Sequence, residues 1–341
     1  MPGYQKVGDD EARARYEKAW GVTLPNKPGL NNFRMVDAIL DGQLHALFVV
    51  GEELALVDGN AEHVQEALEK VDFLVVQEIF MTRTAQFADV VLPGVPSLEK
   101  EGTFVNTERR TQRLYQALEP LGNAKPDWQI LTELAAHLGH NWGYENPSDV
   151  MDEIARLTPL FAGVSYPRLE GYKSLLWPVA EDGTDTPFLY ETEFHFPDGK
   201  ARLYPLEWSH PSETPDETYD LHLNNGRILE HFHEGSMTYK SVGITAKVPD
   251  TFVEVSAELA AERELESGDW VRLTSRWGSI ELRVLLSDRV TGYELYVPHN
   301  SAETPVNILT ASVVDPDNDT PLQRNGGQAY GAPPTRRTPP P

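Results

Sequence analysis

Cysteine is absent from the 341 residues of this chain. Its absence excludes disulfides, zinc sites built on thiolates, iron–sulfur ligation and a cysteine nucleophile within this sequence. A metal bound by the chain itself would need His, Asp or Glu ligands. The other possibility is a metal that belongs to a cofactor.

Basic residues are also scarce, because 29 Lys and Arg stand against 53 Asp and Glu and give a net charge of -24. Phosphate backbones are bound by clustered Lys and Arg, and the sequence has no such cluster. Nucleic acid is therefore not an expected partner. The acidity is typical of a solvated surface.

Long apolar runs are missing as well. No run approaches the roughly 20 residues that cross a bilayer, and the mean hydropathy is -0.42. The first residues, Met1 to Tyr4, lack the basic and apolar regions of a secretory signal. The sequence predicts a cytoplasmic protein without a membrane span.

The length predicts two domains, since single cores tend to split beyond roughly 250 residues. Helices expected after Asn32 and over 61–70 alternate with strands expected over 44–50, 72–76 and 90–92. This alternation is typical of βαβ units in a parallel sheet. Ligands bind outside the carboxyl ends of such strands, where this sequence places Gly51, Glu52, Gln77, Glu78, Thr82 and Thr84.

The middle of the chain is predicted to be less regular. Residues 99–125 are interpreted as a long loop, of the kind that is usually functional or packed on something else. Asp127 is predicted to cap an amphipathic helix that stops at Gly139, and another helix is expected over 148–157. Residues 158–215 are interpreted as a wrapping connection with a short strand at 201–204.

From Tyr219 the pattern changes to short strands separated by turns, which is typical of a compact β barrel. One helix is expected after Ser256. The proline-rich tail after about residue 330 is predicted to be disordered. Strands are expected over 221–223, 251–255, 269–274, 279–286 and 294–297.

Histidines two apart, His231 and His233, have a spacing that allows one shared zinc ion, with His222 upstream. No third ligand stands at a telling distance, so hydrogen-bonding histidines are the favoured interpretation. Together with Arg227, Ser236 and Thr238, these histidines suit an anionic or guanine-bearing ligand. An ordinary solvated loop is the alternative.

Charged and polar residues of the loop 101–110 leave two interpretations open. Glu108, Arg109 and Arg110 can contact a ligand, or they can form a surface charge network of little energetic value. The motifs G-x-G-x-x-G, Walker A and G-x-S-x-G are absent from the whole sequence. No pair of carboxylates stands out as a general acid and base.

Three stretches carry a resemblance to a known family: VVQEIFMTRTAQFADVVLP, EKEGTFVNTERRTQR and KPDWQILTELAAHLG. They resemble the catalytic subunit of formate dehydrogenases in the bis-molybdopterin guanine dinucleotide oxidoreductase family. The segments GRILEHFHEGSMT, LESGDWVRLTSRWGSIELRV and NILTASVVDP are similar to its C-terminal domain. Some assimilatory nitrate reductases are similar too.

The resemblance implies a C-terminal half. In the family the N-terminal half carries the iron–sulfur cysteines, the Cys or selenocysteine on molybdenum, and the catalytic His and Arg. This chain would then be a fragment or a split subunit that needs an N-terminal partner or an electron-transfer subunit. The loop 99–125 would reach for the iron–sulfur domain, which the resemblance places outside this chain.

The resemblance also implies cofactor contacts. The family's pattern is broken at Glu53 and Leu54, where Asn or Asp and then Pro are usual, and at Val57 and Gln323-Arg324. The contacts that it implies fall on Gly51, Glu52, Gln77, Glu78, Asp127, Arg227, His231, Phe232 and His233.

The expected fold is a partial α/β layered domain with a parallel sheet over 1–217, then a six-stranded double-psi-type β barrel over 218–331 and a disordered tail over 332–341. The expected function, implied by the resemblance, is to hold bis-molybdopterin guanine dinucleotide with molybdenum or tungsten, in an enzyme that oxidises formate and passes two electrons to an iron–sulfur cluster. Alone, the chain is predicted to be inactive, with no catalytic residue of its own. The alternatives are a non-catalytic binding or assembly module and, more weakly, a nitrate-reductase-type half.

Overall fold

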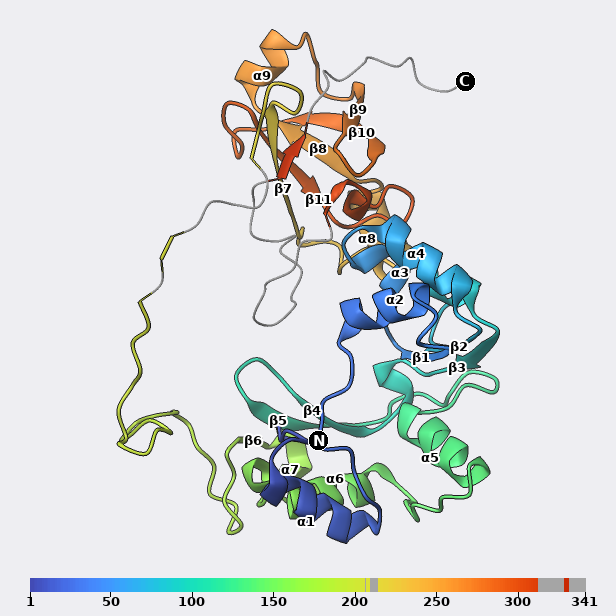
Figure 1. The fold of residues 1–341 in the computed structure, drawn as a ribbon, viewed down its shortest axis with the longest axis vertical. Helices are drawn as coiled ribbons and strands as arrows, with labels where there is room; N and C mark the ends of the chain where they lie inside the picture. Colours follow the sequence, from blue (N-terminus) through green and yellow to red (C-terminus); the bar gives the residue numbers. More distant parts are fainter. Residues whose placement is uncertain (206, 209–213, 312–327, 331–341) are drawn as a thin grey trace. The chain divides into compact units, whose positions relative to one another are not determined.

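The chain is described here from a computed structural model, which covers residues 1–205, 207–208, 214–311 and the backbone of 328–330. Its contacts group it into two compact units, each built from two separate stretches (Figure 1). The first unit holds Met1–Leu30 with Pro93–Leu206, and the second holds Asn31–Leu92 with Glu207–Pro341. The domain boundaries expected from the sequence stay a prediction.

The α/β part of the second unit is built on a sheet with the order β1-β2-β3, in which β1 (Ala46–Val50) pairs in parallel with β2 (Phe73–Glu78). The strand β3 (Val90–Pro93) follows β2. Helices α2 (Asn32–Leu40) and α4 (Ala61–Lys70) pack on one face through apolar side chains that meet Leu74 and Val76. The predicted strands are confirmed within a few residues, but the cap of α2 is Asn31, whose side chain accepts from Arg34 N, and not Asn32.

The described strands of the rest of this unit form a mixed sheet with the order β12-β7-β11-β8-β10-β9. Parallel pairs (β7 with β11, β8 with β10) alternate with antiparallel ones, and the sheet curls around an apolar core. The double-psi connection stays a prediction. The strands are β7 (Leu221–Gly226), β8 (Phe252–Val255), β9 (Trp270–Thr274), β10 (Ser279–Leu286), β11 (Glu294–Pro298) and β12 (Gln328–Tyr330).

Short helices complete this unit. The helix α9 (Ala257–Glu262) begins after Ser256, whose Oγ accepts from Leu259 N at 3.1 Å, as the sequence predicts. The others are α3 (Leu54–Val57) and α8 (Val242–Lys247), with 3₁₀ turns at η1 (Thr84–Phe87), η5 (Thr238–Lys240) and η6 (Val306–Leu309).

The first unit has an antiparallel sheet with the order β4-β5-β6, from β4 (Gly102–Val105), β5 (Arg110–Leu114) and β6 (Ser174–Leu176). The prediction of an irregular loop over 99–125 is therefore wrong. Thr103, Phe104 and Val105 favour a strand, and the turn after them is closed by Asn106 Oδ1, which accepts from Arg110 N at 3.0 Å. Residues 201–204, expected as a strand, are irregular.

Helices of the first unit are α1 (Asp10–Trp20), α5 (Asp127–His137), α6 (Pro147–Leu157) and α7 (Tyr166–Leu169), with η2 (Ser97–Glu99), η3 (Pro159–Phe161) and η4 (Glu170–Tyr172). Asp127 is the first residue of α5, whose N-cap is Pro126. Across the described residues no helix is long and apolar enough to cross a membrane.

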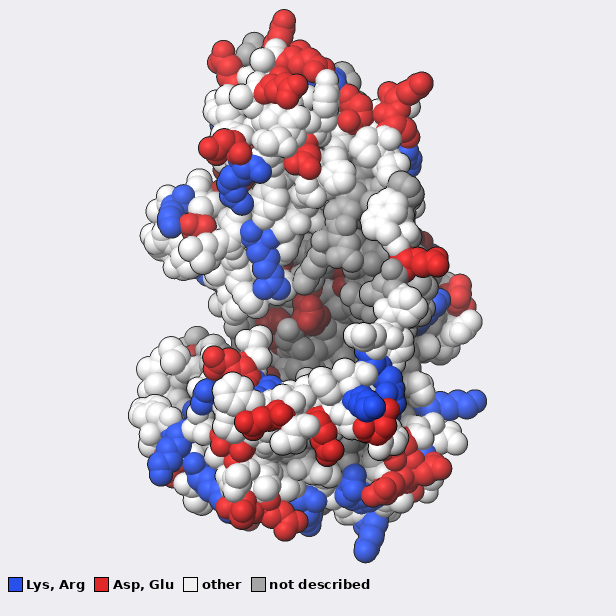
Figure 2. All heavy atoms as spheres, turned by 90° about the vertical axis from the view of Figure 1, so that its left-hand side faces the viewer, with Lys and Arg blue, Asp and Glu red and all other residues white. Residues whose placement is uncertain are grey.

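Acidic side chains are spread widely on the face in Figure 2, with Lys and Arg between them singly or in small groups. Among the described residues, several ion pairs join side chains that are close in sequence, for example Arg13 with Asp10 at 2.6 Å. Such exposed pairs add little stability. The charge pattern on this face therefore agrees with a solvated acidic surface.

Candidate functional site

The ends of β1 and β2 bring four of the predicted residues together. Val50 pairs with Gln77, and Gly51 N donates to Gln77 O at 2.9 Å, so the two turns run side by side. The Gln77 side chain is buried, with 1% of its surface exposed, whereas Gly51 and Glu52 are exposed. Glu78 is half-buried, and its carboxylate accepts from Ile79 N at 2.7 Å.

Glu53, which breaks the family's pattern, turns inward at the same place. Its carboxylate accepts from Arg83 N at 2.9 Å and from both Thr84 N and Thr84 Oγ1, at 2.9 and 2.5 Å. Burial raises the pKa of Glu53, and the hydrogen bonds from Thr84 oppose that rise. Glu53 thus fastens the segment after β2 to the end of β1.

The loop after β7 holds the other predicted group. Arg227 is exposed, and its Nη2 lies 3.0 Å from His233 Nε2. Because a guanidinium can only donate, His233 Nε2 accepts in this arrangement. Phe232 is 55% exposed, with the Arg227 guanidinium 6.0 Å from its ring centroid. The loop therefore presents a cation and a flat apolar ring together.

His231 has a different role from its neighbours. It is buried, Nε2 lies 2.8 Å from the carbonyl oxygen of Val248, and Nδ1 lies 2.8 Å from Thr238 Oγ1. A carbonyl can only accept, so Nε2 carries the proton and Nδ1 accepts from the threonine. With both nitrogens occupied, His231 shapes the loop in this arrangement and offers no nitrogen to a zinc ion or a cofactor.

A cavity of about 790 Å³ lies within the second unit, next to both groups. One wall is the segment that follows Gln77 and Glu78, and another is the segment that follows His233. Its volume falls in the range of small-molecule sites. The lining of the cavity includes Phe80, Thr82, Arg83, Ser236, Tyr239 and Lys240.

The Tyr239 ring is fixed in this lining. It stacks on His231 with ring centroids 4.0 Å apart, and its hydroxyl accepts from Asn300 Nδ2 at 3.0 Å. Burial raises the pKa of Tyr239 to about 12, with the charge of Asp250 adding to the rise. Gly235 has φ +82°, and a Cβ there would lie 2.4 Å from the Tyr239 ring, so only glycine fits.

Charges of both signs line the cavity. Arg83 and Lys240 bring cations, and the Lys240 ammonium lies 4.8 Å from the centroid of the Phe80 ring. Glu234, Asp250 and Glu303 bring carboxylates. Cations suit phosphate groups, and carboxylates accept from the N–H groups of a base or a pterin. The lining therefore offers cations to anionic groups of a ligand and carboxylates to its N–H donors.

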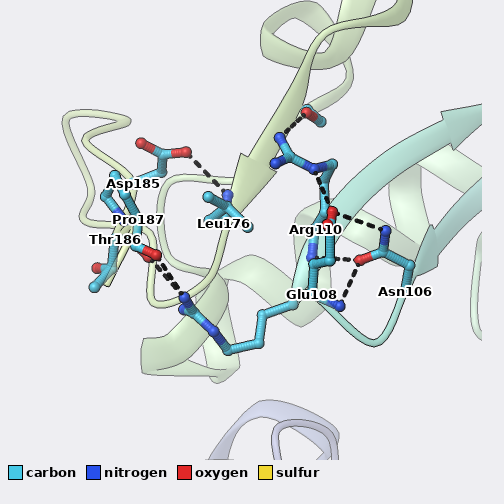
Figure 3. A network of polar contacts seen from close by, with 9 residues as sticks. Asn106, Glu108, Arg110, Leu176, Asp185, Thr186 and Pro187 are labelled. Atoms are coloured by element: carbon cyan, nitrogen blue, oxygen red, sulfur yellow. Dashed lines mark hydrogen bonds and ion pairs between the residues drawn. The ribbon is translucent and has the colours of Figure 1, made fainter. Parts of the chain in front are cut away.

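The loop 101–110 in the first unit forms a charge network, which is one of the two interpretations that the sequence leaves open. Arg110 Nε donates to Glu108 at 3.2 Å, and Arg110 Nη1 donates to Ser174 Oγ at 2.8 Å (Figure 3). Arg109 reaches the carbonyl oxygens of Thr186 and Pro187, both at 3.1 Å. These charges join the hairpin to the chain around β6.

Asp127, the remaining predicted contact, belongs to the first unit and forms an ion pair with Lys100. The other eight predicted residues lie in the second unit. None of them is in the lining of the large cavity, and His233 lines a cavity of about 20 Å³ beside it. Gln323-Arg324 and the tail 332–341 lie outside the described residues. Within those residues, no cluster of His, Asp and Glu could hold a metal ion.

Three residues that line the large or the small cavity are not indicated by any motif in the sequence. Lys240 and Asp250 follow the predicted loop without a motif, and Asn307 donates from Nδ2 to the carbonyls of Leu56 and Val57, at 3.0 and 2.6 Å. Asn307 stands 250 residues from Val57. No local pattern could have indicated this contact.

The second unit thus contains a cavity with a polar and charged lining, and its volume is in the range of small-molecule sites. Residues 6–137 match the family model described as "Molybdopterin oxidoreductase", and residues 221–325 match the one described as "Molydopterin dinucleotide binding domain". The two matches together cover well over half of the sequence. The chain belongs to the molybdopterin oxidoreductase family and carries its dinucleotide-binding domain.

Curated relatives agree with this family. The chain is 58% identical over 325 residues to "Probable oxidoreductase YjgC" and 56% identical over 326 residues to "Putative formate dehydrogenase YrhE", both of Bacillus subtilis. A Staphylococcus aureus relative, "Putative formate dehydrogenase SAUSA300_2258", is 54% identical over 327 residues. The alignments cover 94–95% of this chain but 33% of each relative, so the chain spans about a third of their length.

A solved structure shares the fold. Acetylene hydratase from Pelobacter acetylenicus aligns with 95% of this chain and 50% of its own, with a TM-score of 0.72 and 19% sequence identity.

Proposed function

We propose that this chain is the dinucleotide-binding, C-terminal part of a formate-dehydrogenase-like molybdenum oxidoreductase. The observation that carries the proposal is the cavity of about 790 Å³, whose walls follow the two groups of predicted cofactor contacts. The family match and the names of the relatives support it. The residues that do the chemistry would lie in sequence outside this chain, since no cysteine is available here to ligate the metal.

The chemistry of the lining fits a pterin guanine dinucleotide. Arg83 and Lys240 would hold its pyrophosphate, while Asp250 and Glu234 would accept from N–H groups of its guanine or pterin. Arg227 would add a third cation at the loop after β7. When bound, bis-molybdopterin guanine dinucleotide with molybdenum or tungsten would supply the two-electron chemistry of formate oxidation.

Replacing Arg227 with alanine is expected to weaken binding of GDP, a probe for the guanine nucleotide part, by about tenfold. The reason is that a charged hydrogen bond to phosphate typically contributes about 1.5 kcal/mol or more, and 1.4 kcal/mol is tenfold in affinity. Isothermal titration of GDP and of ADP into the full chain would measure the effect and the base preference.

The matched control is Arg272→Ala, because Arg272 is also exposed in the second unit and pairs with Glu281 at 2.7 Å on the β9–β10 hairpin. We expect its GDP affinity to equal that of the original chain. If Arg227→Ala and Arg272→Ala bind GDP equally well, Arg227 is not a contact. If the original chain binds no guanine nucleotide, the proposed function loses its support.

Co-purification separates the enzyme from the non-catalytic module. An enzyme part is expected to purify with a polypeptide that carries the iron–sulfur cysteines, and the complex should contain molybdenum or tungsten and release guanine nucleotide on acid treatment. Elemental analysis and chromatography of released nucleotides would measure both. A metal-free monomer without nucleotide would favour the assembly module.

A further inference from the structure

Arg227 stands at the exit of β7, and this exit is tied to the neighbouring strand β11. The hydroxyl of Tyr296 on β11 donates to the carbonyl oxygen of Arg227 at 2.6 Å. One residue earlier, Gly226 O accepts from His299 N at 2.9 Å. The main chain on both sides of the Gly226–Arg227 junction is therefore fixed by β11 and the residue after it.

Glycine at position 226 makes room for the tyrosine. A Cβ at Gly226 would lie 2.8 Å from Tyr296 Oη and 3.1 Å from its ring. Any larger residue would push the tyrosine away from the Arg227 carbonyl. Glycine at the end of β7 thus allows Tyr296 to approach the main chain closely.

The Tyr296 side chain is held in place by contacts of its own. Its ring lies 5.4 Å from the guanidinium of Arg289, whose Nη1 donates to Glu254 Oε1 at 2.9 Å. Glu254 is 1% exposed, is the cross-strand partner of Tyr296, and also accepts from Ser287 Oγ at 2.8 Å. Because a buried carboxylate needs its compensating cation, Arg289 is kept over the tyrosine ring.

We propose that Tyr296 is a positioning residue, which fixes the main chain of Arg227 so that the arginine side chain is held ready for the anionic part of the nucleotide. This inference rests on the proposed function. Without the bond from Tyr296, the Arg227 carbonyl loses a restraint, and the guanidinium samples more orientations before binding. Binding then has to order it, which lowers the affinity.

A double-mutant cycle tests the proposal with Tyr296→Phe, Arg227→Ala and the two combined, each titrated with GDP. Tyr296→Phe is expected to weaken GDP binding by about fivefold, the size of one lost hydrogen bond. In the Arg227→Ala background the same change is expected to have no further effect, because the side chain being positioned is gone. A purely structural role would lower the affinity equally in both backgrounds.

Tyr293→Phe is the matched control, since Tyr293 is a nearby tyrosine whose hydroxyl donates to Glu262 at 2.6 Å. Both phenylalanine variants are expected to melt close to the original chain, and only Tyr296→Phe should change GDP affinity. The positioning role is overturned if Tyr296→Phe lowers GDP affinity equally with and without Arg227. It is also overturned if Tyr296→Phe has no effect while Arg227→Ala lowers the affinity. Either result leaves the proposed function intact. If Arg227→Ala itself has no effect on GDP affinity, the positioning role is overturned, while the proposed function fails only if the original chain binds no GDP.

Discussion

Replacing Glu53 with alanine is expected to lower the free energy of unfolding of the second unit by about 3 kcal/mol. Three donors on Arg83 and Thr84 lose their acceptor, and buried donors without partners cost about 1–3 kcal/mol each, partly recovered by water. Urea unfolding followed by circular dichroism would measure the change.

The same variant is expected to weaken ligand binding, because Arg83 lines the large cavity and its main chain is bound by Glu53. Glu53→Gln should lose about half as much stability, since its amide keeps one acceptor oxygen and turns an NH₂ group toward one of the donors.

Glu69→Ala is the control, because Glu69 is an exposed glutamate on α4 in the same unit. Surface substitutions away from special features usually stay within about 0.5 kcal/mol. If Glu53→Ala and Glu69→Ala are equally stable, the buried carboxylate does not hold the segment after β2.

Local signals predicted much of this fold. The strands expected over 44–50 and 72–76 rest on short apolar runs, and they are found as β1 (Ala46–Val50) and β2 (Phe73–Glu78). The cap Ser256 is a short-range pattern too, and it begins α9 as expected. The hairpin of β4 and β5 was missed because its loop-like composition outweighed its alternating strand residues. Its third strand, β6, stands some 60 residues further along the chain, which no local pattern shows.

The sequence indicated which strand ends and loops lie near the large cavity, but not which of their side chains are buried. A strand end places a side chain near a crevice but does not say whether it faces the ligand or the core. Gln77 and His231 are both buried, whereas Glu53, seen only as a departure from the family, fixes part of the cavity wall. Burial is decided by packing between distant segments, which the sequence does not show directly.

Asp58 is expected to make the stability of the protein depend strongly on pH. It follows α3, and its carboxylate accepts from Asn32 Nδ2 at 2.7 Å. Burial raises the pKa of Asp58 from 3.8 to about 6, the hydrogen bond from Asn32 opposes the rise, and the negative charge of Glu52 adds to it.

The direction of the effect follows from proton binding. The folded state binds a proton more tightly than the unfolded state, because the folded pKa of about 6 lies above the ordinary value of 3.8. Stability therefore falls as pH rises from about 4 to about 6 and stays reduced above that range. At about 1.4 kcal/mol per pKa unit, the loss is on the order of 2–3 kcal/mol.

Asp58→Asn is accordingly expected to stabilise the protein by about 2 kcal/mol at pH 7.5 and to change it little at pH 4, since an amide stays neutral and still accepts from Asn32. Urea unfolding at pH 4, 5, 6 and 7.5 would measure the difference curve. Glu52→Gln should act in the same direction but less strongly, because it removes only the neighbouring charge.

Asp288→Asn is the matched control, because Asp288 is an exposed aspartate in the same unit, and Asp58→Asn is expected to stabilise the protein more than Asp288→Asn at pH 7.5. A stabilisation that grows between pH 4 and pH 6 would show that burial of a charge destabilises the folded state at Asp58. If Asp58→Asn instead destabilises the protein equally at every pH, the bond from Asn32 outweighs the cost of burying the carboxylate.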